Sequence, residues 1–324
     1  MYDLPEITFD DIERFADWVE LCALFDSAGV VSQTNVIDVV RDSGILPAME
    51  TDVFSRDDSF IEETQLSSDD SGERFAEQVW QRLSDRALKL KEAYPFDLHD
   101  DLLSRRSTDG KNFAGYAMLL IADLSRFYSA KVSLEPNSKF QFLFEKLVEA
   151  CARELFGGSS VRFGWPREAD WPTGIDSRIR LFGDRMRLTI ESLEGKTKPS
   201  DKDKGLDVAA RLGFGDDGPG TVIFLTQCAT GKNWRRKRGE PSFGEWKDIL
   251  QWQAQLIRVV AVPWRLAYPQ EIISNLRHFD AVILDRTRLN FAVANNFLAA
   301  TIVASMLDWC TAQVTKFPVL RKVA

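Results

Sequence analysis

Apolar residues recur at intervals of three and four through most of the first 130 residues, which is the spacing of helices that bury one face. The pattern predicts helices at residues 9–25, 34–41, 72–93 and 113–128. Residues 50–71 are acidic, rich in serine and nearly aperiodic, which is typical of a linker or a mobile loop. We therefore expect an all-helical N-terminal domain at residues 1–130.

The pattern changes after residue 130 to a mixture of helices and strands. Two strand-like runs, at residues 206–212 and 221–226, are joined by a segment rich in glycine and aspartate that predicts a hairpin. The second run is apolar on both faces, as in a central strand of a covered sheet. The other expected elements are helices at 140–157, 178–194, 243–256 and 289–316 and strands at 161–166, 257–262 and 281–284. Residues 131–324 thus read as an α+β or α/β domain with a mixed sheet between helices.

Two polar side chains stand out in the predicted hairpin. Asp207 lies among apolar residues in the first strand, and Gln227 follows the second strand. If the strands pair with Asp207 level with Gln227, a carboxylate and an amide oxygen converge. A buried carboxylate needs a partner, and a metal ion is one of few good ones. The alternatives are that Asp207 caps its strand or pairs with Lys202 or Lys204, and that Gln227 bonds only to loop backbone.

The hairpin resembles the PD-(D/E)XK superfamily of restriction-endonuclease-like nucleases, whose pattern is an acid on one strand and acid-x-Lys on the next. Asp207 takes the place of the first acid and Gln227 that of the second. Ala229 stands where the family has lysine, and the nearest candidate to supply the missing ammonium is Lys232. Upstream, the segment FQFLFEKLVEACARELFG resembles the opening helix of the family, with Glu145 in the Phe-Glu pair that faces the site. The alternative for Glu145 is an ordinary exposed helix position.

The resemblance implies a restriction-endonuclease-like domain that hydrolyses phosphodiester bonds, with double-stranded DNA as the expected substrate. It implies Mg²⁺, or Mn²⁺ in its place, held by Asp207, Gln227 and Glu145, with Lys232 orienting the attacking water. A restriction, repair or anti-phage setting would follow. Glutamine in place of an acid leaves one ligand neutral, so we expect weaker metal binding than in the family pattern.

Composition changes this picture in two places. The net charge of −8 argues against binding nucleic acid through the global field, but positive charge gathers directly after the candidate site. We expect this basic segment to bind nucleic acid, with a solvated loop as the alternative; it consists of Lys232, Arg235, Arg236, Lys237 and Arg238. Four scattered cysteines and two histidines make zinc sites and disulfide frameworks poor interpretations, which leaves oxygen ligands for any metal.

No signal peptide is evident, and the apolar run at residues 297–307 is too short to span a bilayer, so we expect a cytoplasmic protein without membrane contact. Two rivals remain to the nuclease interpretation. One is a non-catalytic binding or assembly subunit of the same fold. The other is an unrelated α/β protein whose C-terminal helix is an oligomer interface. A homodimer and an activating protein partner are both open.

Overall fold

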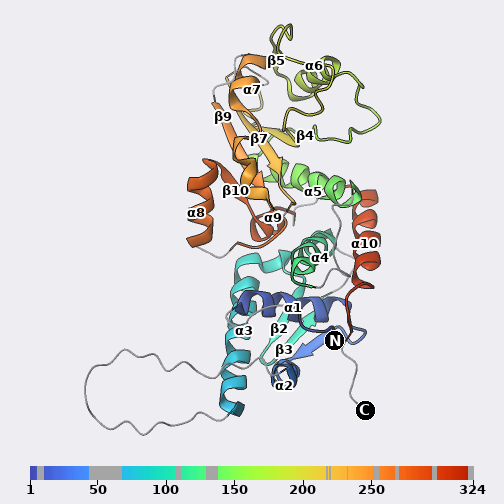
Figure 1. The fold of residues 1–324 in the computed structure, drawn as a ribbon, viewed down its shortest axis with the longest axis vertical. Helices are drawn as coiled ribbons and strands as arrows, with labels where there is room; N and C mark the ends of the chain where they lie inside the picture. Colours follow the sequence, from blue (N-terminus) through green and yellow to red (C-terminus); the bar gives the residue numbers. More distant parts are fainter. Residues whose placement is uncertain are drawn as a thin grey trace, which may run out of the picture. The chain divides into compact units, whose positions relative to one another are not determined.

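The computed structural model describes residues 1–5, 11–43, 68–106, 111–128, 138–216, 218, 220–231, 233–251, 255–266, 270–293 and 298–319. The chain divides into two compact units (Figure 1). Unit 1 comprises Met1–Thr108, Leu124–Ser133 and Val314–Ala324, and unit 2 comprises Asp109–Asp123 and Leu134–Gln313. The predicted boundary at residue 130 therefore lies close to the division between Ser133 and Leu134. Unit 2 also contains Asp109–Asp123, which precede that boundary.

Unit 1 is mainly helical, as the apolar spacing predicts. Its helices are α1 (Ile12–Phe25), α2 (Gln33–Ser43) and α3 (Ser68–Leu90), followed by the short 3₁₀ helices η1 (Lys91–Ala93) and η2 (Ser125–Phe127). The Asp11 side chain caps α1 by accepting the Arg14 N–H at 3.2 Å. Helix α3 begins inside the segment 50–71 that we interpreted as a linker, and residues 50–67 lie outside the described residues.

The expectation of an all-helical unit is wrong in one respect. Three short strands, β1 (Val30–Ser32), β2 (Phe96–His99) and β3 (Leu102–Arg105), form an antiparallel sheet in the order β1-β3-β2. Each has three or four residues, which is too short for an alternation of period two to be recognised. Tertiary pairing, rather than local pattern, decides their conformation.

Unit 2 contains a five-stranded mixed sheet in the order β10-β9-β7-β6-β4. The strands are β4 (Ser160–Arg162), β6 (Val208–Arg211), β7 (Val222–Cys228), β9 (Gln255–Ala261) and β10 (Val282–Leu284). The pairs β4/β6 and β6/β7 are antiparallel, whereas β7/β9 and β9/β10 are parallel. The predicted hairpin is β6 and β7, and β7 is the central strand, as its apolar sequence indicates.

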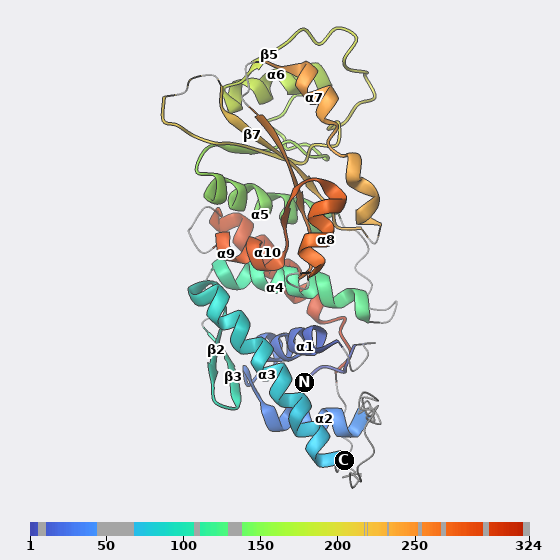
Figure 2. The ribbon, with the colours of Figure 1, turned by 90° about the vertical axis from the view of Figure 1, so that its left-hand side faces the viewer.

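Helices cover both faces of this sheet (Figure 2). Helix α5 (Ser138–Phe156) packs on one face, where the Phe156 ring stacks on Phe224 of β7 with centroids 3.6 Å apart. On the other face, α6 (Ile175–Met186) and α7 (Phe243–Ile249) enclose an apolar core with Phe163, Phe182 and Trp246. The crossover between the parallel strands β7 and β9 runs through α7 and the 3₁₀ helix η4 (Trp234–Gly239).

The remaining helices of unit 2 are α4 (Lys111–Leu124), α8 (Gln270–Phe279), α9 (Arg286–Val293) and α10 (Ala300–Val314). The single C-terminal helix expected at residues 289–316 is thus two helices. The helix expected at 243–256 ends at Ile249, because Leu250 turns to an extended conformation and β8 (Leu250–Gln251) pairs with β5 (Thr189–Ile190). Within the described ranges no helix combines the length and the apolar content needed to cross a membrane.

Candidate functional site

The candidate site lies where β6 begins and β7 ends. The two strands are antiparallel with Val208 opposite Thr226, so the residue before β6 lies beside the last residues of β7. The Asp207 carboxylate accepts hydrogen bonds at Oδ2 from Gln227 Nε2 at 2.5 Å and from the Cys228 N–H at 2.7 Å. The hairpin therefore brings Asp207 and Gln227 together as its sequence predicts.

The backbone around Asp207 is fixed from both neighbouring strands. Its N–H donates to the Thr226 carbonyl at 3.1 Å, and its own carbonyl accepts from the N–H groups of Phe163 and Gly164 at 2.8 and 3.0 Å. Two successive donors to one carbonyl are typical of a β-bulge, a feature that re-aims side chains at the edge of a site. The carboxylate is thus positioned by main-chain bonds and not only by packing.

Glu145 reaches the same place from α5. Its side chain is 6% exposed, and its Oε2 lies 2.7 Å from Nε of Arg162 on β4. A Cβ at Gly164 would lie only 2.3 Å from Glu145 Oε2, so glycine is required at position 164 for the carboxylate to fit. The alternative of an exposed helix position for Glu145 is wrong.

Burial shifts the acidity of both carboxyl groups. The pKa of Glu145 is raised from 4.5 to about 8, first by burial and then by the negative charge of Asp207, against the opposing effect of Arg162. Burial likewise raises the pKa of Asp207 from 3.8 to about 7, and Asp203 adds to the rise. The Cys228 N–H and the positive charges of Lys237 and Arg162 act in the opposite direction. Two acids that influence each other's charge in a buried site are a recurrent feature of functional centres.

Gln227 adds an acceptor without a partner. Its side chain is 3% exposed, and Oε1 has no hydrogen bond although Nε2 is engaged by Asp207. Unpartnered buried acceptors are rare and indicate a missing donor or cation. Two carboxylates and one amide oxygen form the donor set that a hard divalent cation prefers, so these residues fit Mg²⁺ or Mn²⁺. Among the described residues, no group of three or more His, Cys, Asp or Glu side chains could hold a metal, so the amide oxygen and water would have to complete the shell.

The prediction that Lys232 supplies the missing ammonium stays a prediction. Ala229 is fully buried in an apolar cluster with Trp234 and Trp264, so no ammonium stands at the family's lysine position. Lys232 lies outside the described residues. Lys204 is engaged elsewhere, with Nζ 2.7 Å from Glu245 Oε2. Among the described residues, the positive charges of Lys237 and Arg162 lower the pKa of Asp207.

Arg162 is the site residue that the sequence analysis missed. It is 1% exposed, it pairs with Glu145, and its Nη2 donates to the Pro166 carbonyl at 2.9 Å. The signal was present, because a charged residue between Val161 and Phe163 in a short apolar run needs a buried partner. The sequence alone does not show which acidic residue is that partner.

The basic segment forms the 3₁₀ helix η4, and Trp234 anchors it. The Trp234 ring is buried and stacks on Phe279 with centroids 5.2 Å apart. Arg235, Arg236 and Arg238 are exposed, whereas Lys237 is half-buried with Nζ 3.7 Å from Glu240 Oε2. Binding of nucleic acid by this segment stays a prediction.

Comparisons with known proteins add no relative. A scan against protein-family models, a search of curated proteins and a search of solved structures each found no match.

Proposed function

We propose that this chain is a metal-dependent nuclease with a restriction-endonuclease-like domain, and that Asp207, Glu145 and Gln227 form its metal site. The observation that carries the proposal is their convergence from three elements, with an unpartnered amide oxygen beside two acids of raised pKa. The order α5-β4-β6-β7-α7-β9, with three antiparallel strands and then a parallel one, supports the proposal because it is the order that the resemblance implies.

Each residue has a distinct part in this proposal. Asp207 and Glu145 would bind the cation once they release their protons, and Gln227 would add the neutral oxygen Oε1. A bound Mg²⁺ or Mn²⁺ supplies a water of lowered pKa and offsets charge on the scissile phosphate. Arg162 holds the Glu145 carboxylate in place, and the positive charge of Lys237 acts at Asp207, in the part that Lys232 was expected to take.

The first prediction concerns Asp207. Asp207→Asn keeps the shape of the side chain but removes the anionic ligand, so cleavage should fall below detection while the fold is kept. The measurement is cleavage of duplex DNA, single-stranded DNA and RNA with Mg²⁺ and with Mn²⁺. Asp216→Asn is the matched control on the same hairpin, where Asp216 accepts the Gly218 N–H at 3.0 Å and lies outside the candidate site, and it should retain activity. Undiminished cleavage by purified Asp207→Asn protein would refute the metal site.

A second candidate function is a non-catalytic nucleic-acid-binding subunit of the same fold. The ion pair between Arg162 and Glu145 and the bond from Gln227 to Asp207 favour it, because each carboxyl group has a protein partner without a metal. The buried Ala229 also leaves the expected lysine position empty of charge. Under this alternative the wild-type protein binds nucleic acid but cleaves none of the three substrates with either metal.

A further inference from the structure

The loop between β4 and α6 presents an exposed indole directly beside the candidate site. Trp165 is 41% exposed, while each of the other tryptophans among the described residues is at most 7% exposed. It follows Gly164, whose N–H donates to the Asp207 carbonyl and whose missing Cβ makes room for Glu145. Trp165 therefore directly follows the glycine that lies against both candidate acids.

The loop that carries Trp165 is held in place by arginines. Arg162 Nη2 donates to the Pro166 carbonyl at 2.9 Å, and Arg178 Nη2 donates to the Phe163 carbonyl at 2.6 Å. Further along the loop, Arg167 Nη1 donates to the Trp171 carbonyl at 2.7 Å. The exposure of Trp165 is thus a fixed feature of the loop, beside the candidate site.

Positive charge surrounds this ring. The Arg178 guanidinium carbon lies 5.6 Å from the Trp165 ring centroid, and Lys202 Nζ lies 5.9 Å from it. Arg178 is 1% exposed, and its Nε has no hydrogen-bond partner. Lys202 is exposed to solvent. An exposed aromatic ring with a solvent-exposed cation near it, here Lys202, is an arrangement by which proteins stack a base and hold the adjoining phosphate, and the buried Arg178 adds positive charge beside the ring.

We propose that Trp165, together with Lys202 and Arg178, is a stacking platform for one unpaired base of the strand whose phosphate lies at Asp207 and Glu145. A paired base inside a duplex has neighbours on both faces, so an indole can stack on it only after it leaves the helix. The substrate class is therefore single-stranded or locally unpaired nucleic acid, which narrows the double-stranded DNA expected from the resemblance. This inference rests on the proposed function.

The test is equilibrium binding without metal, so that cleavage does not interfere. The probes are a fluorescein-labelled single-stranded oligonucleotide and its perfect duplex, both in EDTA. Trp165→Ala should weaken single-strand binding by about 5- to 100-fold, the range that loss of one stacked base implies, and should leave duplex binding unchanged. Trp165→Phe should recover most of the affinity. Phe214→Ala is the control, because Phe214 is 64% exposed in the β6–β7 turn, and it should bind as the wild type does.

A second measurement uses only the wild-type protein, so it does not depend on the folding of a variant. A single abasic nucleotide is moved along the single-stranded probe, and one position should lose affinity to the same extent as Trp165→Ala. The platform would be overturned if Trp165→Ala lost affinity equally for the single strand and the duplex. It would also be overturned if the wild type lost no affinity at any abasic position. If binding and Asp207-dependent cleavage persist while Trp165→Ala has no effect, the proposed nuclease stands without the platform. If the wild type binds neither probe in EDTA, the platform fails, and cleavage with Mg²⁺ or Mn²⁺ still decides the proposed nuclease.

Discussion

At the scale of single residues, the site concentrates buried ionisable groups. Asp207 and Glu145 are both almost fully buried, and burial is the main reason that their pKa values rise. In the folded protein they therefore hold protons well above the pH at which they ionise in an unfolded chain. Proton binding at these positions is linked to the free energy of unfolding.

The sign of this linkage gives a prediction. Below about pH 4 both folded and unfolded chains hold the two protons, and between there and about pH 7 to 8 only the folded chain does. The stabilisation that the protonated acids provide is thus lost progressively as the pH rises from about 4, and the loss is complete once the pH has passed 7 to 8. Asp207→Asn stays neutral, so its free energy of unfolding relative to the wild type should increase by up to about 1.4 kcal/mol per pH unit between about pH 4 and 7 and should level off above pH 7. Urea unfolding of both proteins from pH 5.5 to 8.5 in EDTA measures this difference.

Added Mg²⁺ provides the matching control for the same measurement. A cation at the site favours the ionised carboxylates, so 10 mM Mg²⁺ should reduce the difference between the two proteins at pH 8.5 and leave it unchanged at pH 5.5. Parallel pH profiles of the two proteins without metal would show that Asp207 does not titrate in the way that its burial indicates.

The sequence was informative about site residues where a polar side chain interrupts an apolar strand. Asp207 and Gln227 could be found in this way, because a short hairpin fixes which strand ends meet. Glu145 was predicted only from the resemblance, because its position on a helix face does not show whether it lies near β6. Trp165 could not be separated from the other tryptophans, because exposure depends on how the loop is bonded and not on its local pattern.

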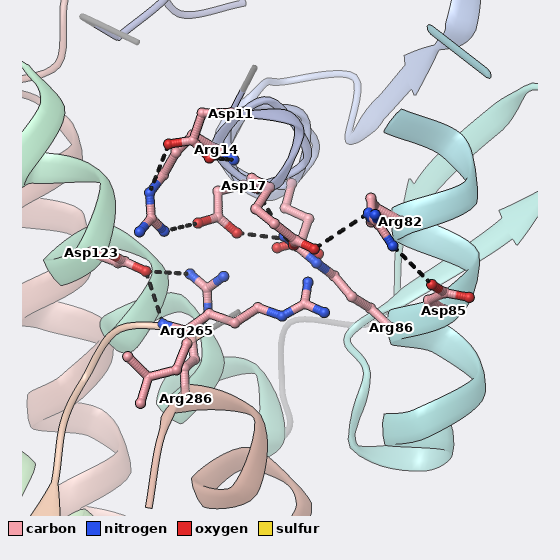
Figure 3. A network of polar contacts seen from close by, with 12 residues as sticks. Asp11, Arg14, Asp17, Arg82, Asp85, Arg86, Asp123, Arg265 and Arg286 are labelled. Carbon is pink, nitrogen blue, oxygen red and sulfur yellow. Dashed lines mark hydrogen bonds and ion pairs between the residues drawn. The ribbon is translucent and has the colours of Figure 1, made fainter. Parts of the chain in front are cut away.

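At the scale of elements, α1 and α3 of unit 1 are joined by buried charges (Figure 3). Arg86 of α3 places Nη1 2.8 Å from both Asp17 Oδ1 and Glu20 Oε1 of α1. Arg86 is 3% exposed, and both carboxylates are fully buried. The tyrosine hydroxyl of Tyr94 also donates to Glu20 Oε1 at 2.8 Å. Such a network fixes how the two helices pair, because each charge needs its partner.

The contrast between Arg86 and Arg82 gives a prediction for these helices. Arg86→Met removes the cation that lies 2.8 Å from both Asp17 and Glu20, so unfolding of unit 1 should become easier by about 3 to 5 kcal/mol. Arg82→Met is the matched control on the same helix, since the Arg82 side chain is 49% exposed and 3.5 Å from Asp85, and its loss should cost about 0 to 1 kcal/mol. Hydrogen exchange of α1 and α3 measures both effects. Equal protection in the two variants would show that the buried network does not hold the helices together.

Helices with a strong apolar period were the elements that the sequence predicted best, and their ends were less certain. The three strands of unit 1 were missed because pairing across distant segments, not alternation, defines them. The predicted helix at 289–316 was too long because the apolar period continues across the interval between Val293 and Ala300, where the described helices end and begin.

At the scale of the whole molecule, the division into units does not follow the order of the chain. Helix α4 precedes residue 130 but belongs to unit 2. The Asp123 carboxylate at its end lies 3.7 Å from Arg286 Nη1 and accepts the Arg265 N–H at 3.1 Å (Figure 3). Asp123 is fully buried, and Arg286 is 2% exposed. Apolar spacing alone gave a boundary at residue 130, because it identifies helices but not the unit in which each one packs.

The last prediction follows from this placement of α4. A fragment of residues 131–324 removes the Asp123 carboxylate from the buried Arg286 and takes away an apolar helix, so it should unfold at a lower temperature than a fragment of residues 109–324, or aggregate. The loss of one partner of a buried ion pair alone corresponds to about 3 to 5 kcal/mol. Thermal unfolding followed by circular dichroism compares the two fragments, and Asp123→Asn in the longer fragment separates the contribution of the charge from that of the helix. If both fragments unfold at the same temperature, α4 is dispensable for unit 2 and the boundary near residue 130 is the better one.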